Sequence, residues 1–207
     1  NISGAEYKRL KRSGWRLDPR IPEKYQIMKE CYGNAPKFSR GHMTRREDPN
    51  WGTDAAQGNA DSMHVTNAVP QMQSFNAGVW LTLENYALEN AKQDDQKISV
   101  ITGPFFGDND PVKYDVKIPV GFWKVIAFIH DATGKLCATG YTISQEDYLQ
   151  NEEFIYGEFE TYQIPIKVIE KKAGISLGSL RELDPFKDES LESIAVPVKS
   201  VRQIKFY

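Results

Sequence analysis

The pattern of apolar and polar positions in the first half of the chain predicts one short strand and one amphipathic helix. Residues 37–43 are predicted to form a strand in which Arg40 and His42 point to the same side, because strand side chains alternate between faces. From about residue 75 to 91, apolar residues recur at helical spacing, and Ser74 before them is a typical helix N-cap. This strand and this helix are the elements on which the candidate chemistry lies.

The second half of the chain is richer in strand-forming residues. Apolar runs predict strands at residues 97–101, 121–131 and 135–144. Shorter elements are expected elsewhere: a helix or loop at 54–61, helices or connections at 145–154 and 161–172, and an edge strand or arm at 193–207.

Length and composition predict a single globular domain. The chain has 207 residues with 40% hydrophobic content, which suits one domain over 1–207, with 185–207 as a C-terminal extension or arm. Apolar runs such as 125–129 are far shorter than the roughly 20 residues of a membrane span, so we expect a soluble protein without membrane contact. Because the chain begins at Asn1, we expect an excerpt or processed part of a longer chain. Two locations stay open: secreted or periplasmic after leader removal, or cytoplasmic within a larger chain.

The charge balance argues against a uniformly basic nucleic-acid-binding protein. The formal net charge is -2, so attraction to phosphates has to come from local clusters. One cluster near the start could equally be an ordinary solvated face, and a second surrounds the predicted strand: Lys8, Arg9, Lys11, Arg12 and Arg16 in the first, Lys37, Arg40, Arg45 and Arg46 in the second.

The cysteines and histidines do not predict a structural zinc site. Cys31 and Cys137 could pair in an oxidising compartment or stay free and buried. None of the three histidines stands at a spacing that would complete a four-ligand zinc site with them.

His42 is the candidate general base. Hydrolysis of a phosphodiester needs a base for water, positive charge near the phosphorus and help for the departing oxygen. A neutral imidazole, with a pKa of about 6.5, can accept a proton near neutral pH. A lone histidine is more often structural, but Arg40 beside it offers paired donors to phosphate oxygens, which favours catalysis. We expect His64 to be structural and His130 to lie at the surface.

Asn76 is the candidate magnesium ligand. Mg²⁺ prefers oxygen ligands and keeps several waters, so one side-chain carbonyl can anchor it when a substrate phosphate supplies another oxygen. Glu84 lies about two helical turns further along and leans back toward the helix start, which favours an outer position around the ion. Asn67 and Gln71 flank a proline and could fix backbone and substrate oxygens. Each of these four residues also has an ordinary alternative, as a helix cap, an exposed glutamate or turn residues.

A series of short motifs follows the chain in a fixed order. It comprises Ser39-Arg40-Gly41-His42-Met43, Thr66-Asn67, Pro70-Gln71, Asn76, Trp80 and Leu83-Glu84, together with Trp15, Asp18-Pro19, Thr102-Gly103-Pro104 and Phe122-Trp123-Lys124. The series resembles the DNA/RNA non-specific endonuclease family of ββα-metal nucleases, and the resemblance extends over most of the chain. The ordered series is specific, whereas Arg-Gly-His alone would not be.

The resemblance implies an α+β fold with a ββα-metal core, in which a central mixed or antiparallel sheet is flanked by helices. It also implies roles by position: His42 as general base, Arg40 as phosphate contact, Asn67 as support of the histidine and metal site, Asn76 as direct Mg²⁺ ligand and Glu84 as its outer partner. Mn²⁺ is expected to substitute for Mg²⁺. Further substrate contacts are predicted at Arg12, Gln71 and Arg45.

Two positions depart from the family pattern. Ser39 stands where the family usually has an aspartate before the arginine, and Leu88 stands where some members have an arginine one turn after Glu84. Loss of these groups could lower activity or shift substrate preference. It leaves the base and the metal ligand in place.

The leading hypothesis is therefore a Mg²⁺-dependent endonuclease that cleaves DNA and RNA without sequence specificity, since phosphate contacts carry no sequence information. The alternative is a catalytically weakened nuclease-like module that binds nucleic acid or a protein partner, with salt-sensitive binding and no cleavage. By resemblance a homodimer is possible, and the pattern does not identify an inhibitor partner.

Overall fold

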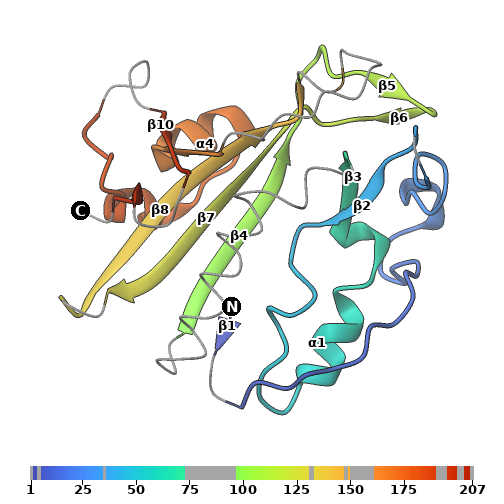
Figure 1. The fold of residues 1–207 in the computed structure, drawn as a ribbon, viewed down its shortest axis with the longest axis horizontal. Helices are drawn as coiled ribbons and strands as arrows, with labels where there is room; N and C mark the ends of the chain where they lie inside the picture. Colours follow the sequence, from blue (N-terminus) through green and yellow to red (C-terminus); the bar gives the residue numbers. More distant parts are fainter. Residues whose placement is uncertain are drawn as a thin grey trace.

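The computed structural model describes residues 2–3, 6–34, 36–72, 97–130, 133–146, 149, 161–189, 195–199 and 203–205, and a six-stranded sheet is its central element (Figure 1). The strand order is β1-β4-β7-β8-β9-β10, and every neighbouring pair is antiparallel. The strands are β1 (Ile2–Ser3), β4 (Lys97–Phe105), β7 (Gly121–His130), β8 (Lys135–Ser144), β9 (Thr161–Ile164) and β10 (Val196–Pro197). The expected central sheet is thus observed, and it is antiparallel.

The hairpin of β7 and β8 confirms the two strands predicted from the apolar runs. Its register extends from Gly121 opposite Ser144 to His130 opposite Lys135. Gly134 in the connecting turn has a φ of +63°, a left-handed conformation that glycine adopts without steric cost. Most of β7 is buried on both faces, which explains why apolar residues occupy consecutive positions instead of alternating, with Lys124 as a buried exception.

Strand β4 extends further than the sequence predicts, to Phe105. Gly103 and Pro104 look like strand breakers, yet they pair with Trp123 and Phe122. A Cβ at Gly103 would lie 2.8 Å from the Trp123 ring, so the absence of a side chain makes room for the indole. The indole Nε1 donates to the Pro104 carbonyl at 3.2 Å.

The segment expected as a helix or connection at 161–172 is a strand followed by a helix. Thr161–Ile164 pairs with β8, and α4 (Ile166–Ala173) begins only after Pro165. The carboxylate of Asp184 accepts hydrogen bonds from the backbone N–H of Ile166 at 2.5 Å and of Phe186 at 3.0 Å. Burial raises the pKa of this carboxyl group, against the effect of those two bonds. A carboxylate distant in sequence therefore accepts the hydrogen bond of a free backbone N–H at the start of the helix.

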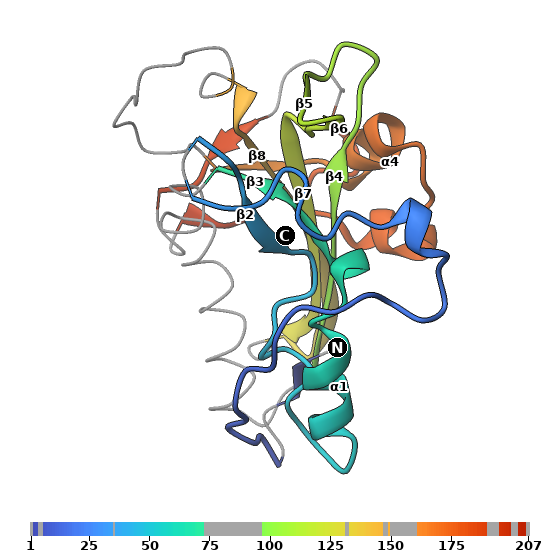
Figure 2. The same cartoon turned by 90° about the vertical axis from the view of Figure 1, so that its right-hand side faces the viewer.

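The sheet packs on both faces. One face places Trp123, Val125 and Ala127 against α4 and the 3-10 helix η4 (Gly178–Leu183). The other buries Phe122 and Ile126 with Ile2 and Ile98, and Met43, Val69 and Met72 pack against this side. Figure 2 shows α4 and the β2–β3 pair on opposite sides of the long strands.

The second layer contains the candidate chemistry. It consists of η1 (Glu23–Tyr25), β2 (Ser39–His42), α1 (Ala55–Asp61), η2 (Val65–Asn67) and β3 (Ala68–Gln71). A small β5–β6 pair (Val112–Lys113, Val116–Lys117) forms a sheet of its own, and Val116 shares a hydrophobic cluster with Tyr32 and Phe38. The predicted strand at 37–43 is confirmed, and the segment at 54–61, expected as a helix or loop, is a helix. The helix predicted at 75–91 lies outside the described residues, as does most of 145–154, so the complete ββα core stays a prediction.

Three smaller expectations have an outcome. Both cysteines are free and buried, and burial raises the pKa of Cys31 to about 11. Pro197 and Val196 form an edge strand on β9, within the segment predicted as a strand or arm. Among the described residues, no helix has the length and apolar character of a membrane span.

Candidate active site

His42 is the last residue of β2, and its imidazole is held from two directions. Its ring centroid lies 4.5 Å from that of Trp15, with the rings tilted by 37°. Its Nε2 lies 3.4 Å from the sulfur of Met63, which is fully buried. A thioether accepts hydrogen bonds but cannot donate, so we infer that Nε2 carries the proton. Nδ1 is then the basic nitrogen.

Asn67 fixes the backbone that follows His42. Its side-chain oxygen accepts from the N–H of Thr44 at 2.8 Å, and its amide nitrogen donates to the carbonyls of Thr44 at 2.8 Å and Ser62 at 2.9 Å. Its backbone carbonyl accepts from the N–H of Met43 at 2.9 Å. The β2–β3 pairing ends with His42 opposite Ala68. The bonds of Asn67 to Met43 and Thr44 continue the contact between the two segments beyond that point.

Gln71 lies beneath the strand that carries His42. It pairs with Ser39 across the two strands and is only 2% exposed. A Cβ at Gly41 would lie 2.0 Å from Cδ and Oε1 of Gln71. The Gln71 amide therefore fits there only because Gly41 has no side chain. A residue buried in this way supports the strand. Its predicted substrate contact stays a prediction.

Arg40 shares its strand with His42, but its guanidinium contacts other groups. It lies over the Tyr32 ring at 4.6 Å, and Nη2 donates to the carbonyl of Met28. Its Nε is buried and has no hydrogen-bond partner within the described part of the chain. The structure therefore fixes the position of this cation and leaves donor capacity on it, while its phosphate contact stays a prediction.

The other predicted residues lie further along or outside the described chain. Arg45 follows β2 closely and pairs with Glu47 at 3.3 Å. Arg12 is exposed on the N-terminal segment and forms no ion pair with any described residue. Asn76 and Glu84 lie at 73–96, outside the described residues. The structure thus places His42, Arg40 and Gln71 on the β2–β3 pair, with Asn67 directly before β3, and leaves the metal side of the site as a prediction.

Sequence reasoning missed the residues that touch the His42 ring. Trp15 was part of the motif series, but nothing in its neighbourhood indicates a contact with His42. Met63 has no local signal at all. His64 forms an isolated bridge with Arg16 just before η2 and is buried, which agrees with its expected structural role.

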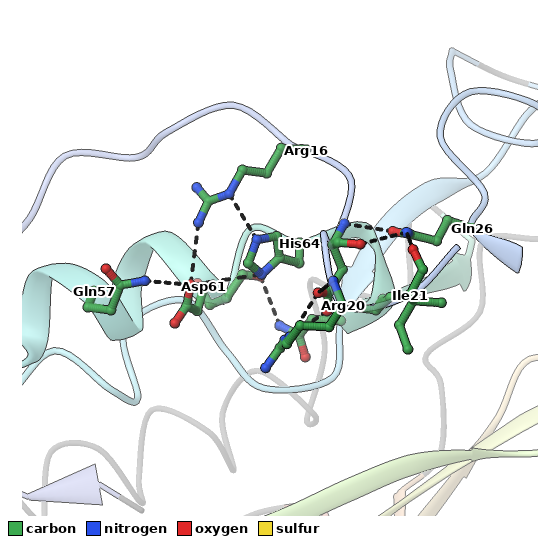
Figure 3. Close-up of polar contacts among 11 residues, drawn as sticks. Arg16, Arg20, Ile21, Gln26, Gln57, Asp61 and His64 are labelled. Atoms are coloured by element: carbon green, nitrogen blue, oxygen red, sulfur yellow. Dashed lines mark hydrogen bonds and ion pairs between the residues drawn. The ribbon is translucent and has the colours of Figure 1, made fainter. Parts of the chain in front are cut away.

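The buried carboxylate of Asp18 stabilises the segment next to η2. Asp18 is 3% exposed, and its two oxygens accept from Arg20 Nε at 2.8 Å and Nη2 at 2.7 Å. Thr66, in η2, donates its hydroxyl to the same carboxylate at 2.8 Å. Figure 3 shows Arg20 with Ile21 and Gln26, whose amide donates to the Ile21 carbonyl at 2.6 Å. These bonds hold the 18–26 loop against η2.

This carboxylate makes stability depend on acid pH. The hydrogen bonds of Arg20, first from its side chain and then from its backbone, hold the pKa of Asp18 well below its usual range. Its stabilising effect is complete above an unfolded pKa of about 3.9 and disappears as the pH falls from there toward the folded value. We expect Asp18→Asn to be less stable at pH 7 and to lose less stability between about pH 5 and 2.5, measured by urea unfolding.

Asp54→Asn is the matched control, because Asp54 is exposed and makes no side-chain hydrogen bond with a described residue. Its acid limb should follow the wild type. An equally steep limb in Asp18→Asn and the wild type would contradict the assignment.

The candidate site can be compared with known proteins. A model of the DNA/RNA non-specific endonuclease family matches residues 1–182. Uncharacterized protein y4fB of Sinorhizobium fredii is 39% identical over 194 residues, which cover 84% of this chain and 29% of that protein. A nuclease of Nostoc sp. is 22% identical, covering 88% of this chain and 65% of that protein. The mitochondrial nuclease EXOG of Danio rerio is 25% identical, covering 80% and 49%.

The fold has a solved counterpart as well. A chain from the crystal structure of the EndoG/EndoGI complex superposes with a TM-score of 0.62 at 21% identity, covering 86% of this chain and 74% of that chain. This likeness shows a shared fold. The aligned region spans less than two thirds of each of the three relatives, at 29%, 65% and 49% of their lengths. Because the family model matches most of its length, the chain belongs to the DNA/RNA non-specific endonuclease family.

Proposed function

We propose that this protein is a metal-dependent endonuclease that hydrolyses the phosphodiester bonds of DNA and RNA without sequence specificity. The observation that carries the proposal is the held imidazole of His42 at the end of β2, with Nε2 against the Met63 sulfur at 3.4 Å and its face against Trp15. Family membership supplies the reaction class. The contact of Nε2 with the Met63 sulfur supports Nδ1 as the basic nitrogen of the proposed general base.

In this proposal Nδ1 of His42 takes a proton from water as the water oxygen attacks phosphorus. The bond between phosphorus and the departing oxygen then breaks, and by resemblance the products carry 5'-phosphates. Arg40, Arg45 and Arg12 are proposed as contacts of substrate phosphates, because guanidinium groups donate paired hydrogen bonds to phosphate oxygens. Asn67 and Gln71 hold the backbone of β2 in place by the contacts described above.

The metal side of the proposal rests on the sequence. In the described part of the chain, no group of three or more His, Cys, Asp or Glu side chains could hold a metal ion. The proposed ligand is Asn76, with Glu84 as its outer partner, and a single amide oxygen suffices for an ion that keeps most of its water. When bound, Mg²⁺ would stabilise negative charge on the departing oxygen. Mn²⁺ is the proposed substitute.

Removal of the metal tests this function. Supercoiled plasmid and a single-stranded RNA are incubated with the protein, with the protein plus EDTA, and with the protein after dialysis and return of Mg²⁺ or Mn²⁺. We expect cleavage of both substrates, loss of more than about 100-fold in rate with EDTA, and recovery with either ion.

Two outcomes would contradict the proposal. Cleavage that continues at the same rate in EDTA would show that the reaction does not need a metal ion. Salt-sensitive binding without cleavage under all conditions would identify the catalytically weakened binding module instead, for which Ser39 in place of the family aspartate is the sequence argument.

A further inference from the structure

His64 is a buried histidine that the proposed mechanism does not use. It is 6% exposed, and its Nε2 accepts a hydrogen bond from Nε of Arg16 at 3.0 Å (Figure 3). A guanidinium has only donors, so Nε2 holds a lone pair and the ring is the neutral form with its proton on Nδ1. This Nδ1 lies 3.9 Å from Asp61 Oδ1 and has no hydrogen-bond partner among the described residues.

Asp61 holds the arginine from the other side. Its Oδ1 accepts from Arg16 Nη2 at 3.4 Å and from Gln57 Nε2 at 2.8 Å. The Arg16 side chain is 40% exposed, so its ion pair with Asp61 is partly screened, whereas its bond to His64 ends in the interior. The bond to His64 is therefore the more specific of the two contacts.

The same two residues join two backbone segments. The N–H of Arg16 donates to the Met63 carbonyl at 3.1 Å, and the N–H of Val65 donates to the Arg16 carbonyl at 2.9 Å, which forms a parallel bridge between Arg16 and His64. Trp15 and Met63 directly precede the two bridged residues, and the Met63 carbonyl is itself one of the bridge acceptors. The bridge therefore fixes the backbone on which both side chains are carried.

Trp15 and Met63 both contact the His42 ring. We propose that the Arg16–His64 pair is a positioning element for the general base: it fixes the spacing between Trp15 and Met63, and thereby the orientation and tautomer of His42. Arg16 and His64 act through their neighbours and do not touch substrate. The inference rests on the proposed function, because it assigns a purpose to the fixed orientation of His42.

The test uses the different reach of asparagine and glutamine. The glutamine amide oxygen can occupy the place of Nε2, which accepts from Arg16, whereas the shorter asparagine amide corresponds to Nδ1. We expect His64→Gln to keep kcat within about threefold of the wild type and His64→Asn to lower kcat by about 10- to 100-fold, with KM for plasmid DNA unchanged. Arg16→Met, which keeps the aliphatic stem, should lower kcat like His64→Asn, and the double variant should fall no further.

A second readout does not depend on cleavage. The ¹⁵N chemical shifts of the His42 ring, measured without metal or substrate, report its tautomer. We expect one tautomer with Nε2 protonated in the wild type and in His64→Gln, and a mixture in His64→Asn and Arg16→Met. If the wild type does not cleave nucleic acid, the proposed function fails while these shifts still test the positioning.

Several results would overturn the inference. Equal kcat values for His64→Gln and His64→Asn would show that the acceptor at the Nε2 position does not matter, whether both values are high or both are low. A change confined to KM would assign the pair to binding. Arg16→Met alters a half-exposed position and is therefore the safer variant for folding. Unchanged ¹⁵N shifts of His42 in this variant would show that the Arg16–His64 pair does not control the tautomer of the His42 ring.

Discussion

Replacing His42 by alanine is expected to lower the rate of plasmid and RNA cleavage by about 10²- to 10⁴-fold, the usual contribution of a positioned general base. The loss should appear in kcat, because the imidazole takes its proton as water attacks and contributes little to binding of the phosphate. The measurement is the initial rate at saturating substrate with Mg²⁺ present. Affinity, measured by fluorescence anisotropy of labelled DNA in EDTA, should stay within about twofold.

His130→Ala is the matched control, since this histidine lies at the end of β7, in a turn with Thr133, and has no part in the proposed mechanism. It should cleave like the wild type. Circular dichroism and urea unfolding show whether the His42 variant keeps its fold. Cleavage by His42→Ala at the wild-type rate would contradict the proposed mechanism, and more strongly so if the cleavage also continued in the presence of a chelator.

Local sequence predicted the parts of the fold that depend on local patterns. The β7–β8 hairpin follows from two long apolar runs around a glycine turn, and β2 follows from alternation around Arg40 and His42. The sequence reasoning was wrong where a long-range contact overrides a local preference. Gly103 and Pro104 continue a strand because Trp123 packs over the glycine, and Thr161–Ile164 is a strand because β8 lies beside it.

The same division applies to the candidate site. His42 and Arg40 could be recognised because two residues on one strand face stand at alternate positions of the sequence. The contacts that hold the imidazole come from Trp15 and Met63, which are distant in sequence and carry no pattern that links them to β2. Their arrangement depends on the bridge between Arg16 and His64, and only coordinates show which backbone segments meet there.

Gly41→Ala is expected to destabilise the protein and to impair cleavage together, because this glycine lies between the base and its support. The added Cβ would lie 2.0 Å from both Cδ and Oε1 of Gln71, which is 2% exposed and has no open solvent to move into. Overpacking of this kind costs about 1–3 kcal/mol, which urea unfolding measures as a lower midpoint. Any shift of β2 that relieves the contact also moves His42, so kcat should fall more than affinity.

A double-mutant cycle separates the close contact from other effects of a new methyl group. Gln71→Ala removes the atoms that the Cβ would meet, so Gly41→Ala combined with Gln71→Ala should be more stable than the sum of the single changes predicts. Gly14→Ala is the matched control: no described atom lies within 4 Å of a Cβ there, and the change should stay within about 0.5 kcal/mol of the wild type. Additive effects of the two single changes would show that the methyl group and the Gln71 side chain do not compete for the same space. The position of β2 would then not depend on the absence of a side chain at Gly41.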